Sequence, residues 1–349
     1  MVAMAQDDSR NLLAGVDAGG TKVAVLVADA QGAARSRATF PTDLSSPENT
    51  VAGIAAAIRE TLAAGGAGPA AVAAVGLGTP GRVDPQTGVV RNAVNLKWEA
   101  MPVGAMLAAA LGVPCFLEND VRVAALGVQA HPAHAGVRDL AYLGIGTGIA
   151  AGVILNGRLY RGAHGMAGEI GHMIMDLDGP RCGCGSRGCL EALTAGPAIA
   201  RLAAQAVAAG AATTLRAAQP LTAAAVYQAA AGGDAVALEI TRQVGRRLAQ
   251  ALQQLVMAYD VERVVLGGGV ARAGDAFLQP ILAELARMRA ESALAAEMLP
   301  AQMFHLLPPD YDAGTWGAVS LASVGLGRIP AAPVDDSTDD SQREPVYRP

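Results

Sequence analysis

The hydrophobic pattern begins with two apolar strands joined by a glycine-rich turn. Over residues 12–29, Leu-Leu-Ala-Gly-Val-Asp leads into Ala-Gly-Gly-Thr-Lys and then into Val-Ala-Val-Leu-Val-Ala-Asp, which is typical of a β-hairpin. Since a strand and not a helix follows the turn, this is not the strand-to-helix phosphate loop of P-loop proteins. The pattern then predicts a helix near 48–64, a buried strand at 71–77, a turn-rich stretch at 78–84 and a short helix near 103–111.

A second strand-turn-strand unit, at residues 139–155, repeats this plan around Gly146-Thr147-Gly148. Two such units predict an internally duplicated α/β fold that holds one ligand between its halves. Between them, an apolar strand at 114–118 gives way to a helix that begins at Asp120, where a helix favours negative charge. Further along, the pattern predicts Ala-rich helices over roughly 195–258, a strand at 261–266 and a helix at about 275–290.

Length and composition narrow the class of protein. At 349 residues the chain is long enough for two lobes with a cleft between them. Hydrophobic residues make up 52% of the chain, yet polar residues or glycine interrupt every apolar run before it reaches the length of a membrane span. The first residues lack the pattern of a secretory signal, and a net charge of -5 without a dense Lys/Arg cluster disfavours nucleic acid as a partner. We therefore expect a soluble, cytoplasmic protein that binds neither membranes nor nucleic acids.

Three glycine clusters stand at the ends of apolar strands. In the first, Asp17-Ala-Gly-Gly-Thr-Lys22, the glycines let the backbone approach a ligand, and a hydroxyl and a cation follow them. Alone, this segment fits an ordinary hairpin turn equally well. A second cluster at 144–148 and a third at 267–269 favour phosphate binding, because the third ends a strand where α/β sheets commonly receive nucleotides.

Two acidic residues, Glu118 and Asp120, flank Asn119 where the buried strand becomes a helix. Phosphoryl transfer to an alcohol needs a carboxylate that orients the hydroxyl and takes its proton. Both acids are candidates for this base. The alternative for Asp120 is a simple helix N-cap, and the two roles are compatible.

His172, Cys182, Cys184 and Cys189 form the pattern H-x9-C-x-C-x4-C. One nitrogen and three sulfurs are a normal tetrahedral ligand set for Zn²⁺, and the glycines between the cysteines supply the tight backbone that a small metal loop needs. The alternative is a group of unrelated thiols. Because four protein ligands leave no open position for water, we expect the zinc to be structural.

Polar residues suited to a sugar gather around this pattern. Glu169 and His172 share the segment Ala167-Gly-Glu-Ile-Gly-His172, and their side chains can exchange hydrogen bonds with a polyol. A zinc-bound imidazole holds its free N–H outward, available to a sugar hydroxyl. Glu191, two residues beyond Cys189, is expected near the same point; the alternative is a solvated helix charge.

Together these segments resemble the ROK family, named for repressors, uncharacterised reading frames and kinases. Residues 17–22 look like the first phosphate loop of the family. The stretch from 144–149, through Gly157 and Gly162, to His172 looks like the family signature. Residues 182–191 look like its zinc loop and the sugar-binding glutamate that follows. The resemblance spans most of residues 12–327. It implies an α/β chain with the two-lobed actin-like ATPase (ribonuclease H-like) fold and a ligand cleft between the lobes.

The resemblance also implies a role for each matching residue. Asp120 is expected to be the catalytic base. The expected sugar ligands are Asn119, Asp120, Glu169, His172 and Glu191, with Gly81 and Asn95 as further candidates. The expected nucleotide-binding residues are Asp17 near Mg²⁺, Gly19, Gly20, Thr21 and Lys22 at the phosphates, Thr147 and Gly148 opposite them, and Gly267, Gly268 and Gly269 near the nucleoside. The expected zinc ligands are His172, Cys182, Cys184 and Cys189.

The implied activity is that of an ATP-dependent hexose kinase, a phosphotransferase with an alcohol acceptor that converts glucose to glucose 6-phosphate. Kinases of N-acetylglucosamine, N-acetylmannosamine or fructose on the same scaffold are alternatives, and a non-catalytic sugar sensor is an alternative of another class. ROK repressors carry a winged helix-turn-helix of many tens of residues before the first loop. Only sixteen residues precede Asp17 here, which disfavours a repressor. Relatives are commonly homodimers, and we expect a homodimer here.

The resemblance also sets the expected boundaries. We expect a flexible N-terminus at 1–11, a small α/β lobe at 12–119, onto which a C-terminal helix at about 313–327 packs back, a large α/β lobe at 120–312 with its zinc loop at 172–191, and a disordered tail at 330–349. One departure follows Glu191, where Ala192-Leu193-Thr194 stands in place of the aromatic and small residue of many relatives. It concerns only the fine shape of the sugar pocket.

Overall fold

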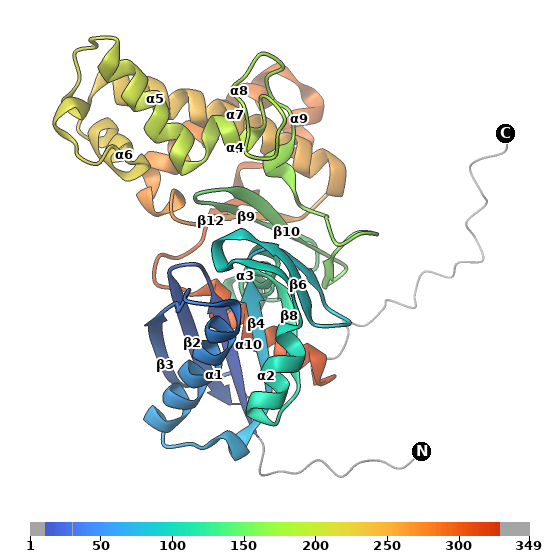
Figure 1. Ribbon diagram of the computed structural model, residues 1–349. Coiled ribbons are helices and arrows are strands. Elements are labelled where there is room, and N and C mark those ends of the chain that lie inside the picture. The colour runs from blue at the N-terminus through green and yellow to red at the C-terminus, as the bar shows by residue number, and fades with distance from the viewer. Residues whose placement is uncertain (1–10, 30, 329–349) are drawn as a thin grey trace, which may run out of the picture.

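A computed structural model describes residues 11–29 and 31–328 of the chain, whose core is two five-stranded sheets (Figure 1). The first sheet comprises β1 (Leu12–Ala18), β2 (Lys22–Asp29), β3 (Ala34–Pro41), β4 (Val72–Thr79) and β8 (Cys115–Asn119). The second comprises β9 (Leu140–Ile145), β10 (Ile149–Leu155), β11 (Arg158–Tyr160), β12 (Arg263–Gly267) and β13 (Phe304–Leu306).

The two sheets have the same topology. Their strand orders are β3-β2-β1-β4-β8 and β11-β10-β9-β12-β13. In each sheet the central strand pairs antiparallel with the second strand of its hairpin and parallel with a later strand. This correspondence confirms the internal duplication that the two strand-turn-strand units predict.

Helices separate the sheets and cover their outer faces. Helices α1 (Pro47–Ala64) and α2 (Val103–Leu111) share a core with one face of the first sheet. The second sheet buries one face under a larger helical layer that comprises α5 (Gly196–Ala208), α6 (Ala223–Ala231), α7 (Ala235–Tyr259), α8 (Asp275–Glu291) and α9 (Ala293–Met298). Between the sheets lie α3 (Asp120–Ala130) and α10 (Ala313–Gly325), as Figure 1 shows.

Helices α3 and α10 pack with their backbones in contact. A β-carbon added to Gly127 of α3 would lie 2.0 Å from the carbonyl oxygen of Ala313, and one added to Gly317 of α10 would lie 1.7 Å from that of Val123. Such distances exclude any side chain at either glycine. The same helix α10 also contacts β1 and β4 of the first sheet, so this pair of helices joins the two halves of the molecule.

Two smaller features complete the fold. A three-stranded sheet of β5 (Arg82–Asp84), β6 (Val89–Ala93) and β7 (Trp98–Met101) follows β4, so the stretch expected to be rich in turns also contains a strand. A cysteine-containing loop leads into the short helix α4 (Leu190–Thr194). The tail at 330–349 and residues 1–10 of the N-terminal segment lie outside the described residues. In the described part of the chain, no helix combines the length and the apolar composition that a bilayer crossing requires.

Candidate active site

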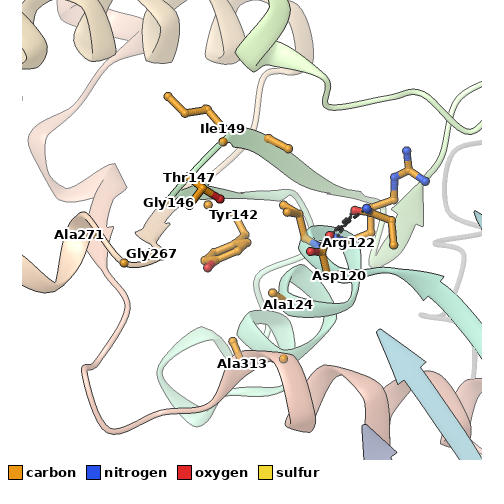
Figure 2. Close-up of a pocket in the computed structure, with 18 of the residues that line it drawn as sticks. Asp120, Arg122, Ala124, Tyr142, Gly146, Thr147, Ile149, Gly267, Ala271 and Ala313 are labelled. Atoms are coloured by element: carbon orange, nitrogen blue, oxygen red, sulfur yellow. Dashed lines mark hydrogen bonds between the residues drawn. The ribbon is translucent and has the colours of Figure 1, made fainter. Parts of the chain in front are cut away.

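A cleft of about 1650 Å³ lies where the strand ends of both sheets and the first turns of α3 and α10 meet. Figure 2 shows Asp120 on α3, Thr147 in the turn after β9, and Gly267 at the end of β12 around one space. The residues expected from the sequence that line it are Asp17, Lys22, Gly81, Asn119, Asp120, Thr147, Gly148, Glu169, His172, Cys184, Glu191, Gly267, Gly268 and Gly269.

Six expected residues do not line the cleft. Gly19, Gly20, Thr21, Asn95, Cys182 and Cys189 are not among the lining residues. Gly20 and Asn95 are nevertheless neighbours, because a β-carbon on Gly20 would lie 2.8 Å from the Asn95 carbonyl oxygen. The first glycine turn therefore packs against the segment between β6 and β7. The Thr42 hydroxyl also donates a 2.6 Å hydrogen bond to the Gly19 carbonyl oxygen of this turn.

Asp120 is half-buried in the first turn of α3, yet it is not the residue that caps the helix. The side chain of Asn119 is the N-cap, since its Oδ1 accepts hydrogen bonds from the backbone N–H groups of Val121 (3.1 Å) and Arg122 (3.4 Å). Asp120 Oδ1 accepts from Val121 N–H at 2.8 Å and from Asn119 Nδ2 at 2.9 Å. Burial raises the pKa of Asp120 above its ordinary value, although these hydrogen bonds oppose the shift. A carboxylate with a raised pKa is a stronger base than an exposed one.

Glu118, the other candidate acid, is engaged elsewhere. Its side chain is fully buried and pairs with Arg122 at 3.2 Å and with Arg161. Arg122 is 4% exposed and also donates to the carbonyl oxygen of Gly165 at 2.5 Å. This charge network ties β8, α3 and the loop after β11 together beneath the cleft. Glu118 is held by these two guanidinium groups and does not line the cleft, whereas Asp120 does, so Asp120 is the better of the two candidates.

Asp17, at the end of β1, faces two other carboxylates. Burial, followed by the charges of Asp120 and Asp312, raises the pKa of Asp17 from 3.8 to about 7. Its Oδ2 lies against the first turn of α10, since a β-carbon on Gly314 would be 2.9 Å from it. Carboxylates that crowd together in this way suit a hard cation such as Mg²⁺, which oxygen ligands bind.

The segment from Glu169 to His172 lies directly on β10. A β-carbon on Gly171 would be 2.0 Å from the carbonyl oxygen of Ile149, and one on Gly168 would be 1.8 Å from that of Ala151. Gly168 also has φ +89°, a left-handed conformation that favours glycine. These two glycines therefore bring Glu169 and His172 to the cleft wall.

His172 and the three cysteines converge in space. Their ligand atoms all lie within 4.8 Å of one another, with His172 Nδ1 3.7 Å from Cys182 Sγ and Cys184 Sγ 3.6 Å from Cys189 Sγ. A tetrahedral zinc with ordinary Zn–N and Zn–S bonds separates its ligand atoms by about 3.6 to 3.8 Å. The hydrogen bond from Ser186 N–H is the main factor that lowers the pKa of Cys184 to about 7. The donor set and its spacing thus fit a Cys3His zinc ion.

Glu191 joins the cysteine loop to the glycine turn after β9. Its Oε2 accepts a 3.0 Å hydrogen bond from Ile149 N–H and would lie 2.6 Å from a β-carbon on Gly148. Its Oε1 lies 3.8 Å from Cys182 Sγ. Glu191 therefore lies between the metal-ligand cluster and a turn expected to bind phosphate.

The cleft also contains residues that the sequence patterns did not single out. Tyr142, Arg82, Arg272 and Asp312 line it together with Arg122. Tyr142 stands in an apolar strand, and its pattern is indistinguishable from that of a core aromatic residue. Asp312 follows a Pro-rich connection and has no neighbour in sequence that marks a site. Only the packing of distant elements shows that these residues belong to the cleft.

Comparison with known proteins accounts for this combination of features. A model of the ROK family matches residues 13–324. The chain belongs to the ROK family. Its duplicated sheets with a cleft between them are therefore the two-lobed actin-like ATPase fold, as the resemblance implied.

Several sugar kinases resemble the chain over most of its length. The glucokinase of Halalkalibacterium halodurans is 33% identical over 76% of this chain and 83% of its own. A crystal structure of a ROK glucokinase from Streptomyces griseus, in complex with glucose and AMPPNP, has a TM-score of 0.73 at 32% identity and covers 90% of this chain and 100% of its own. The N-acetylmannosamine kinase of Citrobacter koseri is 30% identical over 88% of this chain and 97% of its own.

Proposed function

We propose that this ROK protein is an ATP-dependent hexose kinase whose preferred substrate is glucose. One observation carries the proposal: a single cleft is lined by the two glycine turns at 146–148 and 267–269, by the half-buried carboxylate of Asp120, and by Glu169 and His172, whose side chains suit a sugar. Phosphoryl transfer needs these parts together, since catalysis is mainly positioning and electrostatic stabilisation. The similarity to glucokinases supports glucose as the acceptor.

In the reaction, the 6-hydroxyl oxygen of the sugar forms a bond to the γ-phosphorus of ATP, and the bond from that phosphorus to the β,γ-bridging oxygen breaks. Asp120 orients the hydroxyl and takes its proton, and ADP leaves with the bridging oxygen. Asn119, Glu169, His172 and Glu191 bind the other hydroxyls, with Gly81 and Asn95 at the edge of the sugar site. Closure of the lobes excludes water, which would otherwise accept the phosphoryl group.

The nucleotide occupies the side of the cleft lined by the glycine turns at 146–148 and 267–269, together with Asp17 and Lys22 at the ends of the first glycine cluster. Backbone N–H groups of such turns bind phosphate oxygens, and Lys22, which lines the cleft, adds a positive charge. The corresponding residues are Asp17, Gly19, Gly20, Thr21, Lys22, Thr147, Gly148, Gly267, Gly268 and Gly269. Asp17 would hold Mg²⁺, which neutralises charge on the phosphates when it is bound.

Zinc is the second metal of the proposal. His172, Cys182, Cys184 and Cys189 would hold it, and four protein ligands give it a structural role. The cluster then fixes the ring of His172 and, through the loop, the position of Glu191. Thiolate ligands and an ATP donor both suit the reducing cytoplasm, where we place the protein. We further propose a homodimer, and a boundary between the lobes at residues 119 and 120.

Replacement of Asp120 by asparagine tests the catalytic assignment. The amide retains the acceptor for Val121 N–H but removes the base, so we expect kcat to fall by roughly 10²-fold or more. Zinc content and the KM for glucose should change little. Asp84→Asn, at an exposed turn, is the matched control. Near-normal turnover of Asp120→Asn would disprove the assignment.

The substrate is tested with a panel of sugars in a coupled ADP-release assay. We expect glucose to have the highest kcat/KM. A preference for N-acetylmannosamine would support the alternative that the Citrobacter koseri relative favours. A sugar-binding protein without sugar-dependent ADP release would instead be a sensor, and the kinase proposal would fail.

A further inference from the structure

Tyr142 is an aromatic residue of the cleft to which the proposed mechanism gives no role. It lies on β9, is only 6% exposed, and lines the cleft together with Asp17 and Asp120. In Figure 2 its side chain projects from the strand between the Gly146–Thr147 turn and Gly267. The position is therefore next to one turn that is expected at the phosphates and one that is expected near the nucleoside.

The register of the sheet explains how the ring reaches this place. Gly144 follows Tyr142 on the same face of β9, and it pairs with Gly267 on β12. Neither glycine has a side chain, so the ring of Tyr142 lies over this pair. A β-carbon on Gly144 would lie 3.6 Å from Tyr142 Cε1, and one on Gly267 would lie 2.7 Å from the Tyr142 hydroxyl oxygen. The missing side chains thus let the hydroxyl reach the ends of the strands.

The hydroxyl has no protein partner in the part of the chain that the structure describes. No residue of 11–29 or 31–328 hydrogen-bonds to it, whereas the hydroxyl of Tyr311, another tyrosine of the cleft wall, donates to the Gly127 carbonyl oxygen at 2.8 Å. The Tyr142 hydroxyl is not among the buried side-chain atoms that lack a partner, so it is open to the cleft. A ligand in the cleft can therefore accept a hydrogen bond from it.

We infer that Tyr142 donates a hydrogen bond from its hydroxyl to a non-bridging oxygen of the nucleotide's phosphate chain. This inference rests on the proposed kinase function. Among the possible ligand groups, phosphate oxygens fit best, because the hydroxyl lies between the turn at 146–148, expected at the phosphates, and the turn at 267–269, expected near the nucleoside. Tyr142 is then a direct contact of the substrate.

The electrostatic surroundings keep the phenol in the form that can donate. Burial, with smaller contributions from the charges of Asp17 and Asp120, raises the pKa of Tyr142 from 10.0 to about 12. The hydroxyl therefore retains its proton throughout the physiological range. Phosphate oxygens at that pH are acceptors, so donor and acceptor match.

Tyr142→Phe tests the inference, since it keeps the ring over Gly144 and Gly267 and removes only the hydroxyl. Loss of a hydrogen bond to a charged group should lower kcat/KM for ATP by roughly 10-fold to 100-fold. The KM for glucose and the melting temperature should stay close to the wild-type values. The control is Tyr227→Phe, which removes a hydroxyl from a 2% exposed tyrosine packed against Phe277, away from the cleft.

Calorimetric titration with a non-hydrolysable ATP analogue separates this inference from the kinase function. If wild-type protein binds the analogue and Tyr142→Phe binds it at least several-fold more weakly, the inference holds whatever the turnover. Equal binding and a kcat/KM for ATP within twofold of wild type would overturn it. A loss confined to the KM for glucose would overturn it as well, because the hydroxyl would then serve the sugar. If the wild-type protein shows no sugar-dependent ADP release, the kinase proposal is refuted. The binding comparison between wild type and Tyr142→Phe still decides the inference about Tyr142.

Discussion

Replacement of Asp17 by asparagine should make the protein more stable above neutral pH. The carboxylate of Asp17 is half-buried at the end of β1, and its neighbours Asp120 and Asp312 are also acidic. Without Mg²⁺, the charge of Lys22 opposes the shift, but its effect is the smallest of those that act on Asp17. Asparagine has nearly the same shape and carries no charge, so it removes the cost of burying the ionised form.

The size and sign of the effect follow from the raised pKa. Asp17 has a pKa of about 7 in the folded protein and of about 3.8 ordinarily. The folded state therefore binds more protons between about pH 4 and pH 7, and stability falls as the pH rises through this window. At 1.36 kcal/mol per pKa unit the cost is about 4 kcal/mol at pH 8. The first turn of α10, beside the carboxylate, favours negative charge and offsets up to about 2 kcal/mol. We expect a net gain of about 2 to 4 kcal/mol for Asp17→Asn.

The measurement is thermal unfolding of wild type and Asp17→Asn from pH 4 to pH 8, without Mg²⁺ or nucleotide. Each kcal/mol shifts the melting temperature of a unit of 150–250 residues by about 2–4 °C. The two proteins should melt alike near pH 4 and diverge as the pH rises. Glu297→Gln, which removes an exposed carboxylate on α9, should show no such divergence. A difference that does not depend on pH would refute the reasoning.

Three further predictions concern the supporting structure. Cys184→Ser should lose zinc, measured by atomic absorption, and should bind glucose more weakly; full activity of the metal-free variant would contradict the structural role. Gly171→Ala should lower stability by about 1–3 kcal/mol and weaken glucose binding, because the new methyl group meets the Ile149 carbonyl oxygen. Gly53→Ala, which has space around it on α1, should not destabilise. Glu118→Gln should cost about 3 kcal/mol or more in chemical denaturation, because it leaves two arginines without their counter-charge; unchanged stability would show that the network is dispensable.

Strand-turn-strand units and the metal-ligand pattern could be predicted from the sequence because their signals are local. The hairpin at 12–29 is β1 and β2, and the helix expected from Asp120 is α3. The four metal ligands lie within eighteen residues, so their spacing limits how far apart they can fold. Each of these features depends on residues that are close in the chain.

Other features depend on contacts between distant segments. Strand β3 has a polar, charged sequence, Ala-Arg-Ser-Arg-Ala-Thr-Phe-Pro, and forms only because β2 offers a free edge. The residues alone left both Glu118 and Asp120 as candidate bases, and only the family resemblance favoured Asp120. The contact of Glu118 with Arg161, from a segment beyond β10, could not be predicted from the sequence. The inferred role of Tyr142 could not be predicted from the sequence, because it depends on the absence of side chains at Gly144 and Gly267, which lie on different strands.

The position of α10 has a consequence for the order in which the protein forms during synthesis. This helix covers a face of the first sheet, yet it follows β4 by more than two hundred residues. At ordinary translation rates the ribosome needs roughly ten seconds or more to make that intervening chain. During this time, the apolar face of the first sheet that α10 later covers remains exposed. We expect a chaperone that binds this face to dissociate only after α10 has been synthesised.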